Sequence, residues 1–521
     1  MVNKSTMKYP IGVQSFEVLR SGGYVYVDKT DLIYQLAQNH VCFLCRPRRF
    51  GKSLMLSTLE AYFRGKKQLF EGLKIMQLES EWDEYPIFHL DFNGVNFQKE
   101  GALEDTLNTY LCAFEEIYGK DPYAQEFSYG FRFAYVLKKA HEKTGKRCVV
   151  LIDEYDKPLL DVLGENAEKN NREILKGFYS TFKSSDDDLR FVMLTGVTKF
   201  SQVSVFSGFN QPYDISLNPK FEAICGITES ELHAYFEDSI QILADEYSTS
   251  FEDISLRMKR FYDGYHFSRK MTDIYNPFSV FNAFDNSEIR PYWYSTGTPT
   301  YLAKLLEDNH TNVASMLSEW YETGYFIDYR ANTEDPLAML YQSGYLTIKE
   351  VRTQPMGFDT YRLDYPNMEV KSGFVAMLSN RYFDRDDYAS VIRQLVTSLD
   401  TADLAAFRTT LTAYLASIDY AMRKDKEYHF QYTLYLIFSL MSTYNVKVER
   451  HTSQGRADMI VETANHIYVF EFKLDGTAQE ALQQINQTGY TTPYLADPRP
   501  LHKIGISFGK QSGTIDDWLE A

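Results

Sequence analysis

A basic turn that ends in Gly51, Lys52 and Ser53 is the first group of residues in this chain whose types and spacing could do chemistry. It follows the apolar run 41–45 and precedes a segment, 53–63, with helical periodicity. Backbone amides in such a turn, together with the start of the helix, can bind phosphate oxygens. Lys52 would then reach the outer phosphates of a nucleotide, and Ser53 would offer its hydroxyl to Mg²⁺. The remaining members of the expected nucleotide-binding loop are Arg48, Arg49 and Phe50.

This turn departs from the standard phosphate-binding pattern GxxxxGK[ST] at one position, because Arg46 stands where the first glycine is expected. The tripeptide alone is a weak signal, and a basic surface turn is the alternative interpretation. If the turn does bind an anion, we expect Arg46, Arg48 and Arg49 to add positive charge beside it.

Two other strand ends carry matching chemistry. Asp153 and Glu154 end a strongly apolar run. Burying a carboxylate there costs free energy unless it binds a cation or another partner. We expect Asp153 to hold Mg²⁺ and Glu154 to polarise the attacking water. The run 191–200 carries Thr195 near its end, in the place of a γ-phosphate sensor. Together the three ends predict ATP or GTP binding. Polar partners of Thr195 in that role would be Thr198 and Lys199. Candidates for an arginine finger, by residue type only, are Arg172, Arg190 and Arg260.

A second constellation lies near the C-terminus and consists of Asp458, Glu471 and Lys473. Glu471 and Lys473 are two apart in an expected strand, so both side chains project from one face. Asp458 and Glu471 could hold Mg²⁺ or Mn²⁺, which lowers the pKa of a bound water for phosphodiester hydrolysis. Lys473 could orient that water or stabilise the developing charge. An exposed Glu-x-Lys pair on a solvated strand is the alternative. Further polar candidates around this site are Glu427, Glu449, Gln484 and Tyr490.

The elements that must position these groups follow from periodicity. Strands alternating with helices through residues 1–225 predict an α/β domain with a parallel sheet. A capping-box pattern, Thr228 with Glu231, opens a helical lid region over 226–350. A connecting region of helices with a winged-helix-like element is expected over 351–425. A small α/β domain is expected over 426–521, and the family resemblance described below implies a restriction-endonuclease-like fold for it.

Composition bounds the partners. The chain has 521 residues, 44% of them hydrophobic, so several folded domains are expected rather than disorder. A net charge of −17 excludes a general polycation that coats nucleic acid. Five scattered cysteines, no leader-like start and no long apolar run predict a cytoplasmic protein without a membrane partner. We interpret Cys42 and Cys45 as core residues of the first strand rather than a metal or redox pair.

With both constellations in view, the chain resembles bacterial AAA-ATPase-like proteins that carry a C-terminal nuclease domain of the PD-(D/E)XK superfamily. The resemblance covers nearly the whole chain, from PIGVQSFEVLRSGGYVYVDKT through RPRRFGKS, VVLIDEYDKPL, LTGVTKFSQ, FYDGYHFS and YNPFS to GRADMIV and YVFEFK. It implies that Arg46 in place of the first glycine is compatible with nucleotide binding. It also implies ATP and Mg²⁺ at Lys52, Ser53, Asp153 and Glu154, and a nuclease site at Asp458, Glu471 and Lys473. Ala457 replaces the proline of the superfamily's ideal pattern.

These observations leave more than one function open. The first hypothesis is an ATP-regulated nuclease that acts on DNA, with RNA as the alternative substrate, in defence or in mobile-element maintenance. The second is an ATP-driven sensor whose C-terminal domain binds nucleic acid or a partner without cleaving. A scaffold with vestigial motifs is disfavoured by the intact residue sets. A homo-oligomer is compatible with all three.

Overall fold

The computed structural model divides the chain into two compact units. The first comprises Met1–Thr311 with Glu319–Glu369, and the second comprises Asn312–Ser318 with Val370–Ala521. Within them the structure describes residues 7–121, 128–200, 212–294, 313–317, 319–328, 336–355, 357–383, 388–416, 426–442, 447–449, 459–474, 476–488, 491–509 and 514–521.

A five-stranded sheet forms the centre of the first unit. Its order is β2-β3-β4-β1-β5, and every neighbouring pair is parallel. Strand β3 is buried at all its positions, which explains its continuous apolar run. The strands are β1 (Val41–Cys45), β2 (Ile87–Asp91), β3 (Cys148–Asp153), β4 (Leu189–Gly196) and β5 (Tyr213–Asp214).

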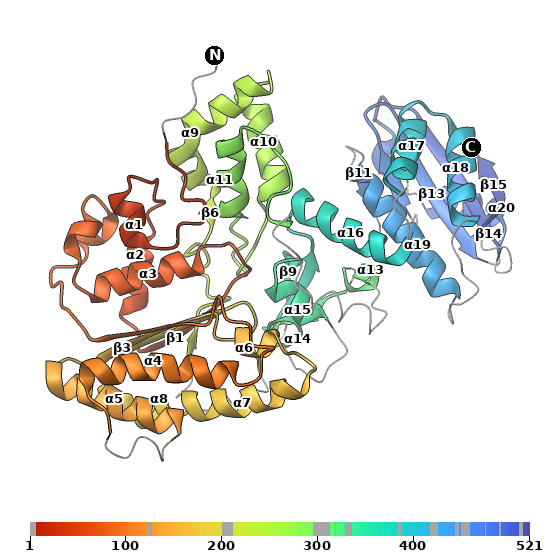
Figure 1. Ribbon diagram of the computed structural model, residues 1–521. Coiled ribbons are helices and arrows are strands. Elements are labelled where there is room, and N and C mark those ends of the chain that lie inside the picture. The colour runs from red at the N-terminus through yellow and green to blue at the C-terminus, as the bar shows by residue number, and fades with distance from the viewer. Residues whose placement is uncertain are drawn as a thin grey trace. The chain divides into compact units, whose positions relative to one another are not determined.

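Helices cover both faces of this sheet. In Figure 1, α4, α5, α7 and α8 lie along one face, and α1 to α3 lie on the other. This arrangement confirms the expected α/β domain with a parallel sheet. The helices are α1 (Phe16–Ser21), α2 (Thr30–Ala37), α3 (Lys52–Phe63), α4 (Ala102–Tyr118), α5 (Tyr129–Thr144), α6 (Lys157–Leu160), α7 (Asn166–Tyr179) and α8 (Thr181–Ser184).

The strand order creates a crevice at one edge of the sheet. The chain leaves β1 towards β2, past β4 and β3, whereas it leaves β4 in the opposite direction, past β1 to β5. Adjacent strands whose connections diverge in this way leave a gap outside their carboxyl ends, where ligands of open α/β sheets bind. The Lys52 loop follows β1, and Thr195 lies in β4.

A helical subdomain follows the sheet, as the sequence predicts. The Thr228 side chain accepts from the Glu231 amide and the Glu231 side chain bonds back, so the capping box is confirmed. Its apolar core includes Phe236, Ile240 and Met258, and Tyr9 from the N-terminal segment packs into it. The elements are β6 (Ile227–Thr228), α9 (Glu229–Glu246), α10 (Phe251–Tyr262), β7 (Ile274–Tyr275) and α11 (Pro277–Asn286).

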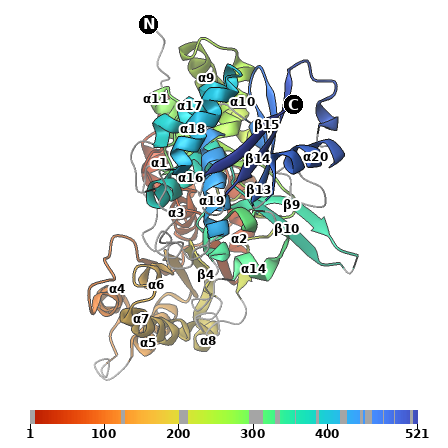
Figure 2. The same ribbon diagram turned by 90° about the vertical axis from the view of Figure 1, so that its right-hand side faces the viewer.

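A three-stranded antiparallel sheet with two short helices completes the first unit, in the part of the chain where a winged-helix-like element is expected. Its three strands pair antiparallel in the order β8-β10-β9, and the β9–β10 hairpin projects from the unit in Figure 2. The elements are β8 (Tyr321–Glu322), α14 (Thr323–Ile327), α15 (Leu337–Gln342), β9 (Thr347–Thr353) and β10 (Asp359–Asp364). The expected boundary at 350 falls inside β9, where a break would cut the ladder with β10. In the structure the division between the two units falls after Glu369 instead.

The second unit is a mixed five-stranded sheet between helices. Its order is β11-β12-β13-β14-β15, with only β13 and β14 parallel. Figure 2 shows α20 on one side of this sheet and α17 to α19 on the other. Alternate residues of β13 serve the two faces: Val469 packs with Ile485 of α20, whereas Phe470 contacts Phe407 and Phe438. The strands are β11 (Lys447–Glu449), β12 (Met459–Glu462), β13 (Ile467–Leu474), β14 (Leu501–Phe508) and β15 (Ile515–Glu520). The helices are α13 (Val313–Met316), α16 (Met368–Phe383), α17 (Tyr388–Asp400), α18 (Leu404–Ala416), α19 (Lys426–Met441) and α20 (Ala478–Thr488).

Within the described ranges, no helix combines the length and the apolar character that crossing a membrane requires.

Candidate nucleotide and nuclease sites

The loop between β1 and α3 adopts an unusual backbone. Gly51 has φ +95° at the N-cap of α3, and Arg49 has φ +67°. Glycine tolerates the left-handed region without penalty, whereas arginine does so at a cost that recurs at ligand-binding loops. No side chain caps the start of α3, so the first amides of this helix are the groups that an anion would bind.

Lys52 lies at the start of α3, almost fully buried. Its Nζ donates to the carbonyl oxygens of Arg46 at 3.1 Å and Pro47 at 3.3 Å. The ammonium is therefore held over the loop by the loop's own backbone. Ser53 follows it, half-buried, and both residues line the same cavity.

Arg46 does not point towards that cavity, contrary to the expectation from its charge. Its guanidinium is buried, donates to the carbonyls of Cys45 at 2.9 Å and Ser216 at 2.7 Å, and stacks on Phe267 at 4.0 Å. Because these acceptors lie behind the loop, Arg46 supports the loop rather than binding an anion. Arg48 and Arg49 remain exposed and line the cavity.

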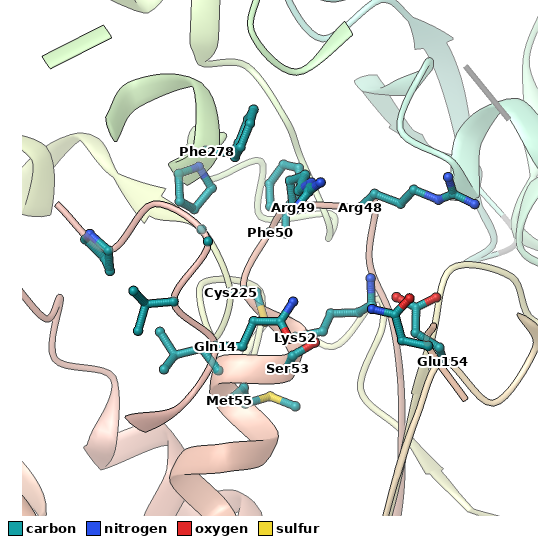
Figure 3. A pocket seen from close by; sticks show the side chains of 18 of the residues that line it. Gln14, Arg48, Arg49, Phe50, Lys52, Ser53, Met55, Glu154, Cys225 and Phe278 are labelled. Carbon is teal, nitrogen blue, oxygen red and sulfur yellow. The ribbon is translucent and has the colours of Figure 1, made fainter. Parts of the chain in front are cut away.

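The Phe50 side chain is held by aromatic neighbours behind the loop. It is buried edge-on against Tyr265 and Phe267, with ring centroids 4.7 and 5.4 Å away. Phe50 is nevertheless among the residues that line the cavity (Figure 3), so it contributes to the cavity wall while aromatic packing fixes its ring. Tyr265 and Phe267 belong to the FYDGYHFS segment, which thus serves as the rear support of the loop.

One cavity of about 840 Å³ gathers the expected nucleotide residues, and small-molecule sites commonly fall between about 300 and 1,000 Å³. Lys52 and Ser53 line it from the start of α3, and Glu154 lines it from the turn after β3. Figure 3 shows these side chains together with Arg48, Arg49 and Phe278. The structure therefore brings the ends of β1 and β3 to one space.

Asp153 and Thr195 do not line this cavity, although Glu154, the neighbour of Asp153 in the chain, does. The Thr195 hydroxyl donates to Asp153 Oδ1 at 2.6 Å, and the Glu154 amide donates to the same oxygen at 3.1 Å. Asp153 is thus fixed by its neighbours on β3 and β4. Glu154 has φ +53°, a strained conformation that turns its side chain away from the course of the strand.

Asp156 is a site residue that sequence reasoning missed. It is fully buried, and its Oδ2 accepts from the amides of Val197 at 3.0 Å and Thr198 at 2.6 Å. Burial, with the nearby Glu154 charge, raises the pKa of Asp156 to about 7. Asp156 therefore ties the turn after β3 to the end of β4. The sequence feature that could have identified Asp156 is its position in the run DEYD, at the end of a buried strand.

Thr198 and Lys199 do not join Thr195 at the site. The Thr198 hydroxyl faces Met339 Sδ at 3.6 Å, and Lys199 Nζ pairs with Asp214 at 2.9 Å and Asp328 at 3.4 Å. Neither residue lines the cavity, and their part in phosphate sensing stays a prediction. Among the arginine-finger candidates, Arg172 pairs with Glu168, Arg190 stacks on Phe63, and Arg260 is exposed.

The remaining cavity wall comes from segments to which the sequence assigned no site role. Segment 10–14 and residues 224–227 form an apolar side, together with Phe278 and Phe281 of α11. Asn93, Asn96 and Gln98 add polar groups from the loop after β2. Such apolar residues carry no chemical signature of their own, so only the fold places them beside Lys52.

In the second unit, Glu471 and Lys473 share one face of β13 as expected. Glu471 is 1% exposed, and its Oε1 lies 3.6 Å from Lys473 Nζ. Lys473 Nζ also donates to Gln484 Oε1 of α20 at 2.5 Å. The pair is therefore partly buried between strand and helix, which argues against a solvated surface pair.

Other expected members of this site cannot be placed. Asp458 and Tyr490 lie outside the described residues. Asp458 directly precedes Met459, whose Cα pairs with Phe470 in the β12–β13 ladder. Glu427 is in α19 and Glu449 in β11, but their side chains lie outside the description.

The position of Gln484 depends on a close helix–strand contact. A Cβ on Gly505 of β14 would lie 2.3 Å from the Ala478 carbonyl oxygen, so only glycine lets α20 approach. Thr477 and Glu480 exchange hydrogen bonds at the start of α20 and fix where it begins. Gly505 pairs with Glu471 across the sheet, so this contact lies beside the site.

Among the described residues, one group of three carboxylates elsewhere has metal-ligand spacing. Glu229, Asp263 and Asp273 have ligand atoms within 4.8 Å of one another. The Lys259 ammonium already bonds Glu229 and lies 3.2 Å from Asp273 and 3.8 Å from Asp263. This lysine supplies the cation that the group needs.

Comparison with known proteins agrees with this organisation. A family profile described as "Predicted AAA-ATPase" matches residues 10–206, and one described as "PD-(D/E)XK nuclease superfamily" matches residues 425–518. A protein of Azotobacter chroococcum mcd 1, described as "Uncharacterized protein in vnfD 5'region", is 36% identical to this chain over 530 residues. The aligned region covers 98% of each of the two chains. The solved structure of the Aeropyrum pernix ORC1 protein in complex with DNA has 14% identity and a TM-score of 0.24, covering 68% of this chain and 95% of that one. A TM-score this low supports no inference about the present chain.

Fold and site define a protein with an ATPase-like unit built on a parallel sheet and a second unit of the nuclease-superfamily type. The chain belongs to the family of AAA-ATPase-like proteins with a C-terminal PD-(D/E)XK nuclease-superfamily domain.

Proposed function

We propose that the first unit binds and hydrolyses ATP with Mg²⁺ and that the second unit is a metal-dependent nuclease acting on DNA, with RNA as the alternative substrate. The observation that carries the ATPase part is the single cavity lined by Lys52, Ser53 and Glu154. An ammonium, a hydroxyl and a carboxylate at the carboxyl ends of parallel strands suit a magnesium-bound polyphosphate.

The residues of the first unit would share the work as follows. Lys52 and the amides of loop 48–53 bind phosphate oxygens, and Ser53 with Asp153 holds the magnesium side. Thr195 keeps Asp153 in place through its hydroxyl. Glu154 lines the cavity and accepts the proton of the attacking water. The apolar wall formed by Phe278 and Phe281 suits the uncharged part of the nucleotide.

In the second unit, a buried carboxylate beside a lysine supports the nuclease proposal. Glu471, with Asp458, would hold Mg²⁺ or Mn²⁺, which supplies an activated water when bound. Lys473 is held by Gln484 and Glu471, so its ammonium is oriented for the scissile phosphate. Defence against foreign DNA or mobile-element maintenance would use such an activity.

The test uses the purified full chain. Plasmid, linear DNA and RNA are each incubated with Mg²⁺ or Mn²⁺, with and without ATP, beside a Glu471→Ala control. We expect ATP hydrolysis, and cleavage that EDTA and the control variant abolish. ATP turnover without cleavage of any substrate would refute the nuclease and favour the second candidate, an ATP-driven sensor. The charge of −17 is the observation that keeps this candidate in view.

A further inference from the structure

A hydrogen bond reaches the phosphate-binding loop from outside the motif. The indole Nε1 of Trp293 donates to the backbone carbonyl of Arg48 at 3.0 Å. Trp293 is 6% exposed, and its ring packs edge-on against Tyr345 with centroids 5.3 Å apart. The loop peptide between Arg48 and Arg49 is thus held through its oxygen by a well-packed side chain.

Glu369 in turn holds Trp293. This fully buried side chain accepts from the Trp293 amide at 2.6 Å through Oε1 and from the Ser279 hydroxyl at 2.7 Å through Oε2. Burial raises the pKa of Glu369 to about 7. A buried carboxyl that loses such partners is left with unsatisfied oxygens at a cost, so the three residues are expected to move together.

Trp293 and Ser279, two of the partners of Glu369, both lead to the cavity. Ser279 lies in α11, whose Pro277, Phe278 and Phe281 line the cavity wall. Trp293 leads to the loop through the Arg48 carbonyl. One carboxyl is therefore bonded to two sides of the space in which we propose that nucleotide binds.

Glu369 also occupies a special place in the chain. It lies in the first turn of α16, and it is the last residue of the first unit. Through α16 the chain passes for the last time from the first unit to the second. The neighbouring Asn367 is anchored to the Asp263 carbonyl at 2.9 Å, away from the cavity.

We propose that Glu369 is a positioning residue for the phosphate-binding loop, acting through Trp293, and that this link makes the start of α16 respond to nucleotide. The proposal rests on the proposed ATP binding. The Arg48 carbonyl and the Arg49 amide belong to one rigid peptide plane. A phosphate that takes the amide on one side of this plane must change the hydrogen bond that Trp293 makes on the other side.

Hydrogen–deuterium exchange of the full chain with and without Mg²⁺-ATP tests the link. In the wild type, peptides over 46–63 and over 368–383 should both exchange more slowly with nucleotide, the latter by roughly twofold to tenfold, as expected for one strengthened hydrogen bond. Trp293→Phe keeps a ring but loses the indole donor. At saturating nucleotide it should retain protection over 46–63 and lose the response over 368–383.

Matched variants make the result specific. Trp82→Phe is the control, because the Trp82 indole N–H has no hydrogen-bond partner among the described residues, and it should behave as wild type. Glu369→Gln keeps the shape and should weaken the α16 response even if Trp293→Phe fails to fold. Nucleotide protection over 46–63 without any change over 368–383 in the wild type, or an unaltered α16 response in both variants, would overturn this inference alone. No nucleotide protection anywhere would overturn the proposed ATP binding and this inference with it.

Discussion

Replacing Lys52 by alanine tests the central assumption about the nucleotide site, which is that the Lys52 ammonium binds a phosphate. Lys52 Nζ already donates to two loop carbonyls, at 3.1 and 3.3 Å. A phosphate that captures the ammonium therefore replaces at least one uncharged acceptor, a loop carbonyl, with a charged phosphate oxygen. With ~1.5–3 kcal/mol for the bond to the phosphate and ~0.5–1.5 kcal/mol for the weaker bond to an uncharged carbonyl, the difference spans ~0–2.5 kcal/mol, and we take its middle part, ~1–2 kcal/mol, as the net contribution to ATP binding.

That net contribution corresponds to a rise in Kd for Mg²⁺-ATP of roughly 5- to 30-fold in Lys52→Ala. Titration calorimetry measures it directly, and a thermal melt without nucleotide checks that the variant is folded. Lys199→Ala is the matched control, because Lys199 is paired with Asp214 and Asp328, away from the cavity, and its Kd should equal that of the wild type. Equal Kd values for Lys52→Ala and wild type would refute the assignment of Lys52. Weaker ATP binding in Lys199→Ala alone would instead support a role for Lys199 as the phosphate sensor.

Four further predictions concern single residues. Glu154→Gln should bind ATP with wild-type Kd but hydrolyse it at least ~100-fold more slowly in a phosphate-release assay, and wild-type turnover would place the base elsewhere. Glu471→Ala should lose metal binding and DNA cleavage, whereas Lys473→Ala should keep the metal in calorimetry and slow cleavage; persistent cleavage in an Asp458→Ala/Glu471→Ala variant would disprove the site. Gly505→Ala should lower unfolding stability by ~1–3 kcal/mol in denaturant titration, because its Cβ meets the Ala478 carbonyl, and a neutral result would show that α20 can shift. The pKa of Asp156 is raised in the folded state from 3.8 to about 7, so the folded protein binds one more proton than the unfolded chain between these values. As the pH rises from 4 to 7, the unfolding free energy of the wild type should therefore fall relative to that of Asp156→Asn, by at most ~1.4 kcal/mol per pH unit. Parallel stability profiles of the two proteins against pH would contradict this.

Sequence alone determined the elements whose signal is local. The sequence predicts the strand VCFLC, the Lys52 loop and the following helix, because apolar periodicity and a glycine turn depend only on neighbouring residues. The capping box at Thr228 and the shared face of Glu471 and Lys473 were equally local, since a helix start and a strand period depend on residues only two or three apart.

Sequence patterns could not decide which of the polar side chains near the strand ends would line the cavity. Lys199 and Arg46 have the right charge in the right motifs, yet the path after β4 and the packing of Phe267 take both away from the cavity. Conversely, Asp156, Trp293 and Glu369 act through partners 41 to 245 residues distant in the chain. Their roles depend on burial and on long-range hydrogen bonds, which exist only once the tertiary structure has brought the segments together.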